Sequence, residues 1–343
     1  MSETVSPGAG QAPKSNLDLI NECDSFPYFT RSPERYTQQV QSYYHLLLPN
    51  SEATFGYILP SVAALFANLP AWELDDAART LTLTGGHDEP TRSALVAQTC
   101  AAMRATGHFA VLGGWRDELY PVYDDAGTCV FTVERSASPL FGVLTYGVHL
   151  TAYVPARSPT DSPRLWVPRR AAHKQTYGGM LDNTVAGGIA AGESPWTTLL
   201  REATEEASLP AQLLRERARA AGTVSYFSVR DERAGGETGL LQPECQFVYD
   251  LPVEESTELA PGDQEVEGFE LLSVAAVKDA LAKGEFKPNC ALVLLDFFIR
   301  HGILTPEGER DYPEIVARLH RILEFPCAVP ARIDGIILDE EDS

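Results

Sequence analysis

The stretch that decides the fold reads Gly187-Gly-Ile-Ala-Ala-Gly-Glu193, followed after seven residues by Arg201-Glu-Ala-Thr-Glu-Glu206. Between its two halves, Ser194 is a favourable N-cap and Pro195 suits a first helical turn, so we predict a helix from about Pro195 to Ala207. Apolar residues recur in it at helical spacing and give the helix one face to bury against a core. They are Trp196, Leu199, Leu200, Ala203 and Ala207.

Three glutamates share another face of this helix, because residues three and four positions apart are neighbours. Glu202, Glu205 and Glu206 would repel one another there, which favours a hard divalent cation held between their oxygens. Gly187, followed by a second glycine, permits a tight turn in which a backbone carbonyl reaches the same ion. We therefore predict a magnesium site, with manganese possible, whose ligands are Gly187, Glu202, Glu205 and Glu206. Arg201 can hold a carboxylate with its rigid fork. A solvated acidic face is the alternative.

Composition places the chain among soluble globular proteins. Its 343 residues suggest two structured units, and 44% of them are hydrophobic without a run long enough to span a bilayer. The net charge of -21 argues against nucleic acid as a partner, since phosphate backbones need a basic surface. The cysteines show neither zinc nor disulfide spacing, so we predict reduced thiols and a cytoplasmic protein. They are Cys23, Cys100, Cys129, Cys245, Cys290 and Cys327.

The chain divides at a region of small residues around Pro139. We predict a disordered leader over residues 1–16, an α+β domain over 17–139, a second domain over 140–304, and a C-terminal helix with an acidic tail over 305–343. The first domain should contain strands, a long helix and a hairpin arm near Glu118–Asp124. The predicted strands of the second domain are Leu144–Val154, Leu165–Val167, Thr223–Val229, Glu244–Leu251 and Phe269–Leu272, and its further helices are Val274–Lys283, Ala291–His301 and Pro313–Leu323.

The glycine-to-glutamate stretch resembles the Nudix box: glycine, five residues, glutamate, seven residues, Arg-Glu, an apolar residue, any residue, Glu-Glu. One position departs from the box, because Ser208 stands where a glycine is usual. The resemblance implies an α+β chain in which the first domain precedes a Nudix α/β/α sandwich with a mixed sheet. It also implies magnesium-assisted cleavage of a diphosphate, with Glu205 and Arg201 in catalytic roles. A carboxylate outside the helix often acts as ligand or base in this family; Glu265 is our candidate, with Glu267 second.

A second resemblance extends from about residue 43 to 323. The segments Gly114-Trp-Arg-Asp-Glu-Leu-Tyr120, Leu165-Trp-Val-Pro-Arg-Arg170, Thr176-Tyr-Gly-Gly-Met-Leu-Asp-Asn183 and Phe286-Lys-Pro-Asn289 look like those of fungal and plant Nudix proteins related to thiamine pyrophosphokinase. The activity associated with that group is a metabolite repair: removal of phosphate from damaged forms of thiamine diphosphate to give monophosphates.

Six residues before the box are our candidates for substrate binding. Arg169, Arg170 and Lys174 form the densest basic cluster and could meet a phosphate, although strand-end solvation is the plain alternative. Tyr177 could stack on a heterocycle, as could two aromatic residues further upstream, Trp115 and Tyr120, or all three could be core. Asp182 and Asn183 could bind a ring edge or cap their own turn. We assign no role to His149 or His173.

The predicted function is hydrolysis of thiamine diphosphate-like compounds, above all oxidised or damaged forms, to monophosphate plus phosphate. The alternatives are a Nudix hydrolase of another nucleoside diphosphate derivative and a sensor that binds a diphosphate without cleaving it. An isopentenyl diphosphate isomerase would need a cysteine near the start of the second domain, and none lies between Cys129 and Cys245. The partner is a small-molecule diphosphate, with neither nucleic acid nor a membrane, and the oligomeric state is left open.

Overall fold

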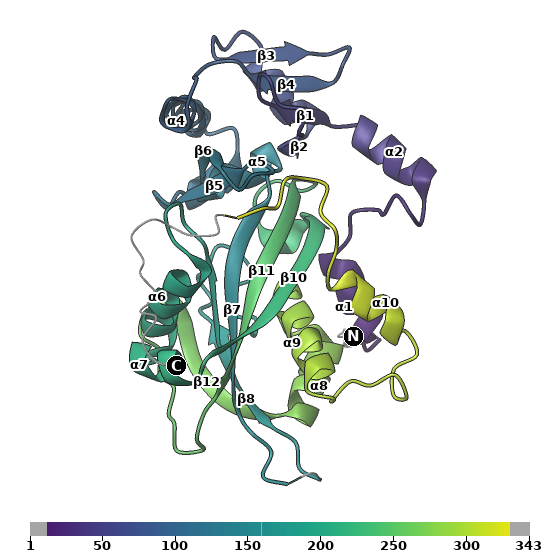
Figure 1. Ribbon diagram of the computed structural model, residues 1–343, viewed down its shortest axis with the longest axis vertical. Coiled ribbons are helices and arrows are strands. Elements are labelled where there is room, and N and C mark those ends of the chain that lie inside the picture. Colours follow the sequence, from purple (N-terminus) through teal and green to yellow (C-terminus); the bar gives the residue numbers. More distant parts are fainter. Residues whose placement is uncertain (1–11, 159, 330–343) are drawn as a thin grey trace, which may run out of the picture.

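The computed structural model describes residues 12–158 and 160–329. The predictions for residues 1–11 of the leader and for the acidic end, Asp339–Ser343, lie outside these ranges. The predicted class is confirmed: an α+β unit precedes a second unit in which helices cover a mixed sheet (Figure 1). Within the described ranges, none of the helices combines the length and the apolar character needed to cross a bilayer.

The first unit is built on a four-stranded sheet in the order β2-β1-β4-β3, next to a separate hairpin. The long helix α4 begins at a capping box, in which the Asp88 side chain accepts from the Thr91 amide and Thr91 bonds back, and it packs on β6 of the hairpin. The hairpin confirms the predicted arm. The elements are α2 (Pro33–Gln41), β1 (Tyr44–Leu47), β2 (Gly56–Ile58), α3 (Pro60–Ala63), η1 (Ala64–Phe66), β3 (Trp72–Asp75), β4 (Thr80–Leu83), α4 (Glu89–Thr106), η2 (Ala110–Gly114), β5 (Leu119–Tyr123), β6 (Cys129–Glu134), η3 (Arg135–Ala137) and α5 (Ser138–Phe141).

The sheet of the second unit runs in the order β10-β11-β7-β8-β12, with β9 added beside β7. Its β7 and β11 are parallel and the other neighbours are antiparallel, so the sheet is mixed as predicted. The strands are β7 (Thr145–Val154), β8 (Arg164–Arg170), β9 (Val185–Gly188), β10 (Arg219–Val229), β11 (Leu241–Pro252) and β12 (Val266–Ser273).

Helices lie on both sides of this sheet and bury its two faces in separate cores (Figure 1). Alternate residues of β7 and β11 point to opposite faces, which is why both cores draw on the same strands. On one side are α6 (Pro195–Ala207) and α7 (Ala211–Arg217); on the other are α8 (Val274–Lys283), α9 (Pro288–Arg300), α10 (Tyr312–Arg318) and α1 (Asn16–Cys23), and the turn η4 (Glu232–Ala234) lies between β10 and β11.

The structure places α1 on the second unit, although the predicted first domain starts at residue 17. Its buried face packs against α9 and α10. Directly after it, Asp24 is 1% exposed and accepts from Arg318 Nε at 3.2 Å and from Arg321 Nη1 at 3.1 Å. The amino-terminal helix is therefore tied to the carboxyl-terminal segment by buried charge pairs.

The C-terminal helix ends earlier than the predicted Pro313–Leu323. After Arg318 the chain runs beside β10, where the Ser225 amide donates to the carbonyl of Leu319 at 3.0 Å. Backbone pairing with a strand competes with helical hydrogen bonds, and here it terminates the helix.

Candidate functional site

The box helix α6 forms as predicted, from Pro195 to Ala207. Ser194 caps it, because its hydroxyl accepts from the Thr197 amide at 3.1 Å. Leu199, Ala203 and Ala207 of its apolar face are buried in the core. Ser208, which replaces the usual glycine, takes the left-handed conformation itself, with φ 53°. The departure from the box therefore leaves the helix end intact at the cost of some backbone strain.

Arg201 holds the carboxylates of the box together. It binds Glu193 in a bidentate manner, with Nε–Oε1 2.8 Å and Nη2–Oε2 2.9 Å. Its Nη1 atom donates to Glu202 Oε1 at 3.0 Å and to Glu205 Oε2 at 3.1 Å. The planar fork thus fixes the rotamers of three acids at once.

Two of the three predicted metal-binding glutamates are buried. Glu206 accepts from the Ala186 amide at 3.1 Å, and burial, with the nearby charges of Glu202 and Asp182, raises its pKa to about 8. Burial also raises the pKa of Glu202, and Arg201 counteracts it. Glu205 lies at the surface, with 52% of its side chain exposed. Acids with raised pKa values in a confined place are typical of sites that bind a cation or move a proton.

Gly187 packs directly on this cluster. A Cβ atom at that position would overlap the carboxyl group of Glu202, so only glycine lets the backbone of β9 approach so closely. The donors that meet here are all oxygens, which suits magnesium or manganese. Across the described ranges, the side chains do not already form a group of three or more acids, histidines or cysteines in metal-binding geometry. Arg201 occupies two of the carboxylates instead.

The predicted base Glu265 lies beside the cluster and is engaged by cations. It pairs with Lys174, and Arg116 Nη1 lies 3.5 Å from its Oε1. Burial raises the pKa of Glu265, but Lys174 and Arg116 outweigh it and leave the pKa below its ordinary value. Glu265 and Lys174 line a small pocket together with Glu206. The second candidate, Glu267, instead accepts from the Ala172 amide at 3.0 Å.

Arg170 and Asp182 form a buried ion pair at 2.5 Å. Arg170 also donates to the carbonyls of Tyr177, at 3.2 Å, and Thr176, at 3.1 Å. Burial raises the pKa of Asp182, but Arg170 and Lys287 outweigh it and hold the pKa far below its ordinary value. Arg170 and Asp182, two of the predicted substrate ligands, thus stabilise the loop from Thr176 to Asp182.

The other predicted substrate residues lie around the same loop. Arg169 is exposed and donates to the carbonyl of Gly179 at 2.8 Å. Asn183 Oδ1 bonds His149 Nδ1 at 2.7 Å, while its Nδ2 atom is buried without a partner among the described residues. Tyr177 has φ 52° and faces a larger cavity. The predicted set therefore surrounds one loop, but its members face two different spaces.

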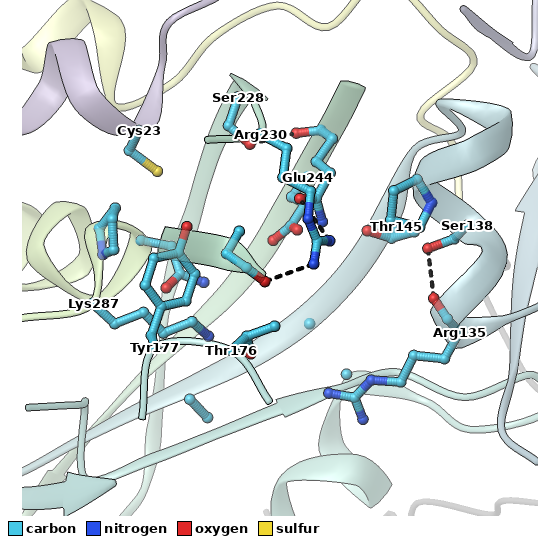
Figure 2. A pocket seen from close by; sticks show the side chains of 18 of the residues that line it. Cys23, Arg135, Ser138, Thr145, Thr176, Tyr177, Ser228, Arg230, Glu244 and Lys287 are labelled. Carbon is cyan, nitrogen blue, oxygen red and sulfur yellow. Dashed lines mark hydrogen bonds between the residues drawn. The ribbon is translucent and has the colours of Figure 1, made fainter. Parts of the chain in front are cut away.

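The larger cavity, of about 220 Å³, opens between the two units beside Gly187. Figure 2 shows Tyr177 and Lys287 on one side of it and Arg135 on the opposite side. Of the aromatic residues singled out in the sequence, Tyr120 and Tyr177 line it. Its charged and aromatic lining includes Glu22, Arg116, Tyr120, Arg135, Tyr146, His149, Tyr177, Tyr226, Arg230, Asp231, Glu244 and Lys287.

A carboxylate network forms one wall of this cavity. Glu244 Oε2 accepts from Gln246 Nε2 at 2.8 Å and from the hydroxyl of Tyr226. Its Oε1 atom has no hydrogen-bond partner within the described part of the chain, and no cation there pairs with it. His149 faces the same space, and burial lowers its pKa to about 4, so it stays neutral. A ligand would therefore meet one open carboxylate oxygen and a neutral imidazole.

The sequence interpretation assigned no role to Glu244, His149, Lys287 or the two arginines of the first unit, although Arg116 lies in the segment Gly114-Trp-Arg-Asp-Glu-Leu-Tyr120 that resembles relatives. Glu244 and His149 lie on β11 and β7. The alternation of a strand predicts on which side of the sheet a side chain lies, but not what it contacts there. Lys287 belongs to the segment Phe286-Lys-Pro-Asn289, whose resemblance to relatives was a usable signal. Arg135 follows β6 in a turn, and nothing in the sequence marks it.

Comparisons with known proteins match both units of the chain. Residues 148–290 match the NUDIX domain, and residues 34–145 match a domain of unknown function (DUF4743). The chain is 38% identical over 259 residues to an uncharacterized protein of Saccharomyces cerevisiae, YJR142W, and the match covers 74% of this chain and 75% of that protein.

A plant relative and a solved structure extend the comparison. Nudix hydrolase 20 of Arabidopsis thaliana, described as chloroplastic, is 37% identical over 219 residues, or 63% of this chain and 55% of that protein. The crystal structure of DR0079 from Deinococcus radiodurans is 20% identical with a TM-score of 0.37, covering 52% of this chain and 99% of that one. With its complete box on a capped, buried helix, its match to the NUDIX domain and a plant relative named as a Nudix hydrolase, the chain belongs to the Nudix hydrolases, enzymes that act on pyrophosphate bonds.

Proposed function

We propose that this chain is a magnesium-dependent pyrophosphohydrolase of thiamine diphosphate-like compounds, above all oxidised or damaged forms, which it converts to monophosphate plus phosphate. The observation that carries the substrate class is the cavity beside Gly187, in which the open oxygen of Glu244 lies among aromatic side chains. A heterocycle with N–H donors or a positive charge would be matched by that oxygen, and its diphosphate would extend toward the acidic helix.

The residues at the box fit a divalent cation. Gly187 admits a backbone carbonyl next to Glu202, and Glu206 is buried close to the charges of Glu202 and Asp182, which a divalent cation would offset. We propose that Gly187, Glu202, Glu205 and Glu206 hold magnesium, with manganese as an alternative. A magnesium ion bound there would offset phosphate charge and lower the pKa of a water molecule.

The side chains around the ion site divide the remaining work. Arg201 positions Glu202 and Glu205, so its catalytic contribution is to keep the ligands in place. Glu265 is the proposed base, and Lys174 keeps it ionised and oriented. Lys174 and Arg170 of the predicted basic cluster both line the small pocket that Glu206 and Glu265 share.

We propose indirect roles for most of the other predicted substrate ligands. Arg170 and Asp182 support the loop that presents Tyr177 to the cavity. Asn183 fixes the tautomer of His149 by accepting from Nδ1, which leaves Nε2 as an acceptor for the ligand. Arg169 lies outside both pockets, so a contact with the substrate would require it to leave the carbonyl of Gly179.

A phosphate-release screen with magnesium tests the proposal. Thiamine diphosphate and its oxidised analogues are compared with ADP-ribose, NADH and nucleoside triphosphates by kcat/KM, and the products are identified by chromatography. We expect the thiamine compounds to be cleaved with the highest kcat/KM and to give the monophosphate. Preference for ADP-ribose or NADH would support the nucleotide alternative instead, and binding without turnover would support a sensor.

Replacing Glu244 by Gln tests recognition of the heterocycle separately from cleavage of the diphosphate. The variant keeps the shape of the wall but removes the charge, so kcat/KM for thiamine diphosphate should fall on the order of tenfold or more. Hydrolysis of a nucleoside triphosphate, if present, should change far less. Equal effects on both substrates would contradict the assignment of Glu244 to the heterocycle.

The cytoplasmic location of the protein stays a prediction.

A further inference from the structure

Two arginines of the first unit lie beside the acids of the second. Arg116 Nη1 is 3.5 Å from Glu265 Oε1. Arg135 lines the cavity together with Gly187, and its guanidinium points from its own side of the cavity in the direction of Thr176 (Figure 2). The Glu202 carboxyl packs against Gly187, so Arg135 faces the cavity that the glycine turn of the box borders.

Both arginines are held in place by the base of the β5–β6 hairpin. The carboxylate of Glu134 accepts from the Arg116 amide at 3.0 Å and from the Ser136 amide at 3.3 Å. Glu118 accepts from Arg135 twice: its carbonyl takes the amide at 2.8 Å and its carboxylate takes Nη1 at 2.8 Å. Arginines fixed by their own hairpin lose little freedom on meeting a ligand.

The hairpin is docked on the glycine turn of the box. The Ala191 amide donates to the carbonyl of Leu119 at 2.8 Å. Tyr120 is buried against Gly188, where an added Cβ atom would overlap the phenol oxygen. The first unit therefore contacts the backbone that carries the proposed metal ligand Gly187, and its position relative to the acids is set by packing.

The guanidinium of Arg135 has N–H donors that no described residue engages. Among the described residues, its side chain makes one hydrogen bond, from Nη1 to Glu118, so Nε and Nη2 remain for a ligand in the cavity. A planar fork with free N–H groups next to a diphosphate site is suited to non-bridging phosphate oxygens, which it can bind in a bidentate manner.

We propose that Arg135, assisted by Arg116, binds phosphate oxygens of the substrate, so that the first unit is part of the active site. This inference rests on the proposed function, since it assumes that a diphosphate occupies the space between the cavity and the box helix. The amino-terminal unit then supplies the positive charge that the acidic box lacks, from a hairpin held rigidly on the glycine turn. Charge fixed before the reaction stabilises developing negative charge without reorganisation.

Binding of methylenediphosphonate, which cannot be hydrolysed and carries no organic group, tests the inference. Titration calorimetry with magnesium is carried out on the wild-type chain, Arg135→Gln, Arg135→Lys and the control Arg35→Gln. Arg35 lies exposed on α2, so its replacement changes the charge of the same unit without touching the cavity. We expect Arg135→Gln to weaken binding on the order of tenfold or more, Arg135→Lys to weaken it less, and Arg35→Gln to leave it unchanged.

The outcomes separate this inference from the identity of the substrate. The probe has no heterocycle, so a failure of the thiamine assignment leaves the result with methylenediphosphonate unaffected. If Arg135→Gln does not fold, as judged by circular dichroism, Arg135→Lys decides, because it keeps the charge but loses the fork. Wild-type affinity in a folded Arg135→Gln variant, or in Arg135→Lys when that variant must decide, would overturn the inference.

A variant of Glu118 distinguishes binding from a structural role. Glu118→Gln removes the negative charge opposite Arg135, but its amide oxygen can still accept from Nη1 and keep the guanidinium in the cavity. If Arg135 serves only to neutralise Glu118, the two single variants should have similar KM values for the best substrate. We expect Arg135→Gln to raise KM and lower kcat, and Glu118→Gln to change both much less; equal effects of the two variants would refute phosphate binding.

Discussion

Replacing Glu206 by Gln should stabilise the metal-free chain while abolishing turnover. Glu206 is 8% exposed, and burial raises its pKa to about 8 from an ordinary value of 4.5. A carboxyl whose pKa is raised by folding contributes stability through its bound proton below pH 4.5, and this contribution is lost as the pH rises toward 8. Glutamine keeps the shape, can accept from the Ala186 amide, and does not titrate.

The structure sets the magnitude of this effect. From the ordinary pKa of 4.5 to pH 7 is an interval of 2.5 pH units. At about 1.4 kcal/mol for each unit, the buried carboxyl lowers the free energy of unfolding by about 3 kcal/mol at pH 7. The loss should stop growing above about pH 8, where the folded chain also carries the ionised form. In Glu206→Gln this loss is absent, so we expect the variant to exceed the wild type by that amount.

Urea unfolding followed by tryptophan fluorescence, with EDTA present, measures the difference at pH 5, 7 and 8.5. Glu205→Gln is the matched control, because Glu205 lies on the same helix with 52% of its side chain exposed, and its variant should follow the wild type within the small range of surface ion pairs. Magnesium should raise the stability of the wild type and affect Glu206→Gln much less. A Glu206→Gln variant no more stable than the wild type at pH 8.5 without metal would refute the reasoning.

Two further variants test the supports of the site and of the fold. Gly187→Ala places a Cβ atom on the Glu202 carboxyl, so magnesium-dependent kcat/KM should fall on the order of a hundredfold. Gly268→Ala, where an added Cβ meets nothing within 4 Å, should keep its activity, and equal activity of both variants would contradict the close approach. Asp24→Asn removes the fully buried counter-charge that Arg318 and Arg321 share and leaves them only Glu314 and Glu324, so the free energy of unfolding should fall by about 3 kcal/mol in urea titrations. Asp24 lines neither pocket, so the kcat/KM of the Asp24→Asn variant for the best substrate should stay unchanged. A loss of activity in the folded variant would contradict a role of Asp24 in stability alone.

Much of the second unit could be predicted because its signals are local. A cap at Ser194, a proline in the first turn and apolar residues at helical spacing suffice to define α6, and the structure confirms its bounds. Strand alternation likewise located β7 from its sequence. Shorter or less periodic elements were missed, among them α1, whose partners α9 and α10 lie almost 300 residues away in the chain.

The sequence by itself determined the chemistry of the box: which side chains are acids, that one helix displays them together, and that Gly187 can lie against them. Only the tertiary structure decided their surroundings. Glu206 is buried because α6 packs against β9, and this burial raises its pKa. The spacing of residues in the box does not predict that packing. The approach of Arg135 and the cavity beside Gly187 arise where the two units meet, and Glu265 lies beside Lys174 because two loops of the second unit, distant in sequence, come together. Local propensity acts within a few residues, whereas electrostatic environment is set by every chain segment brought within several ångströms, whatever its distance in sequence.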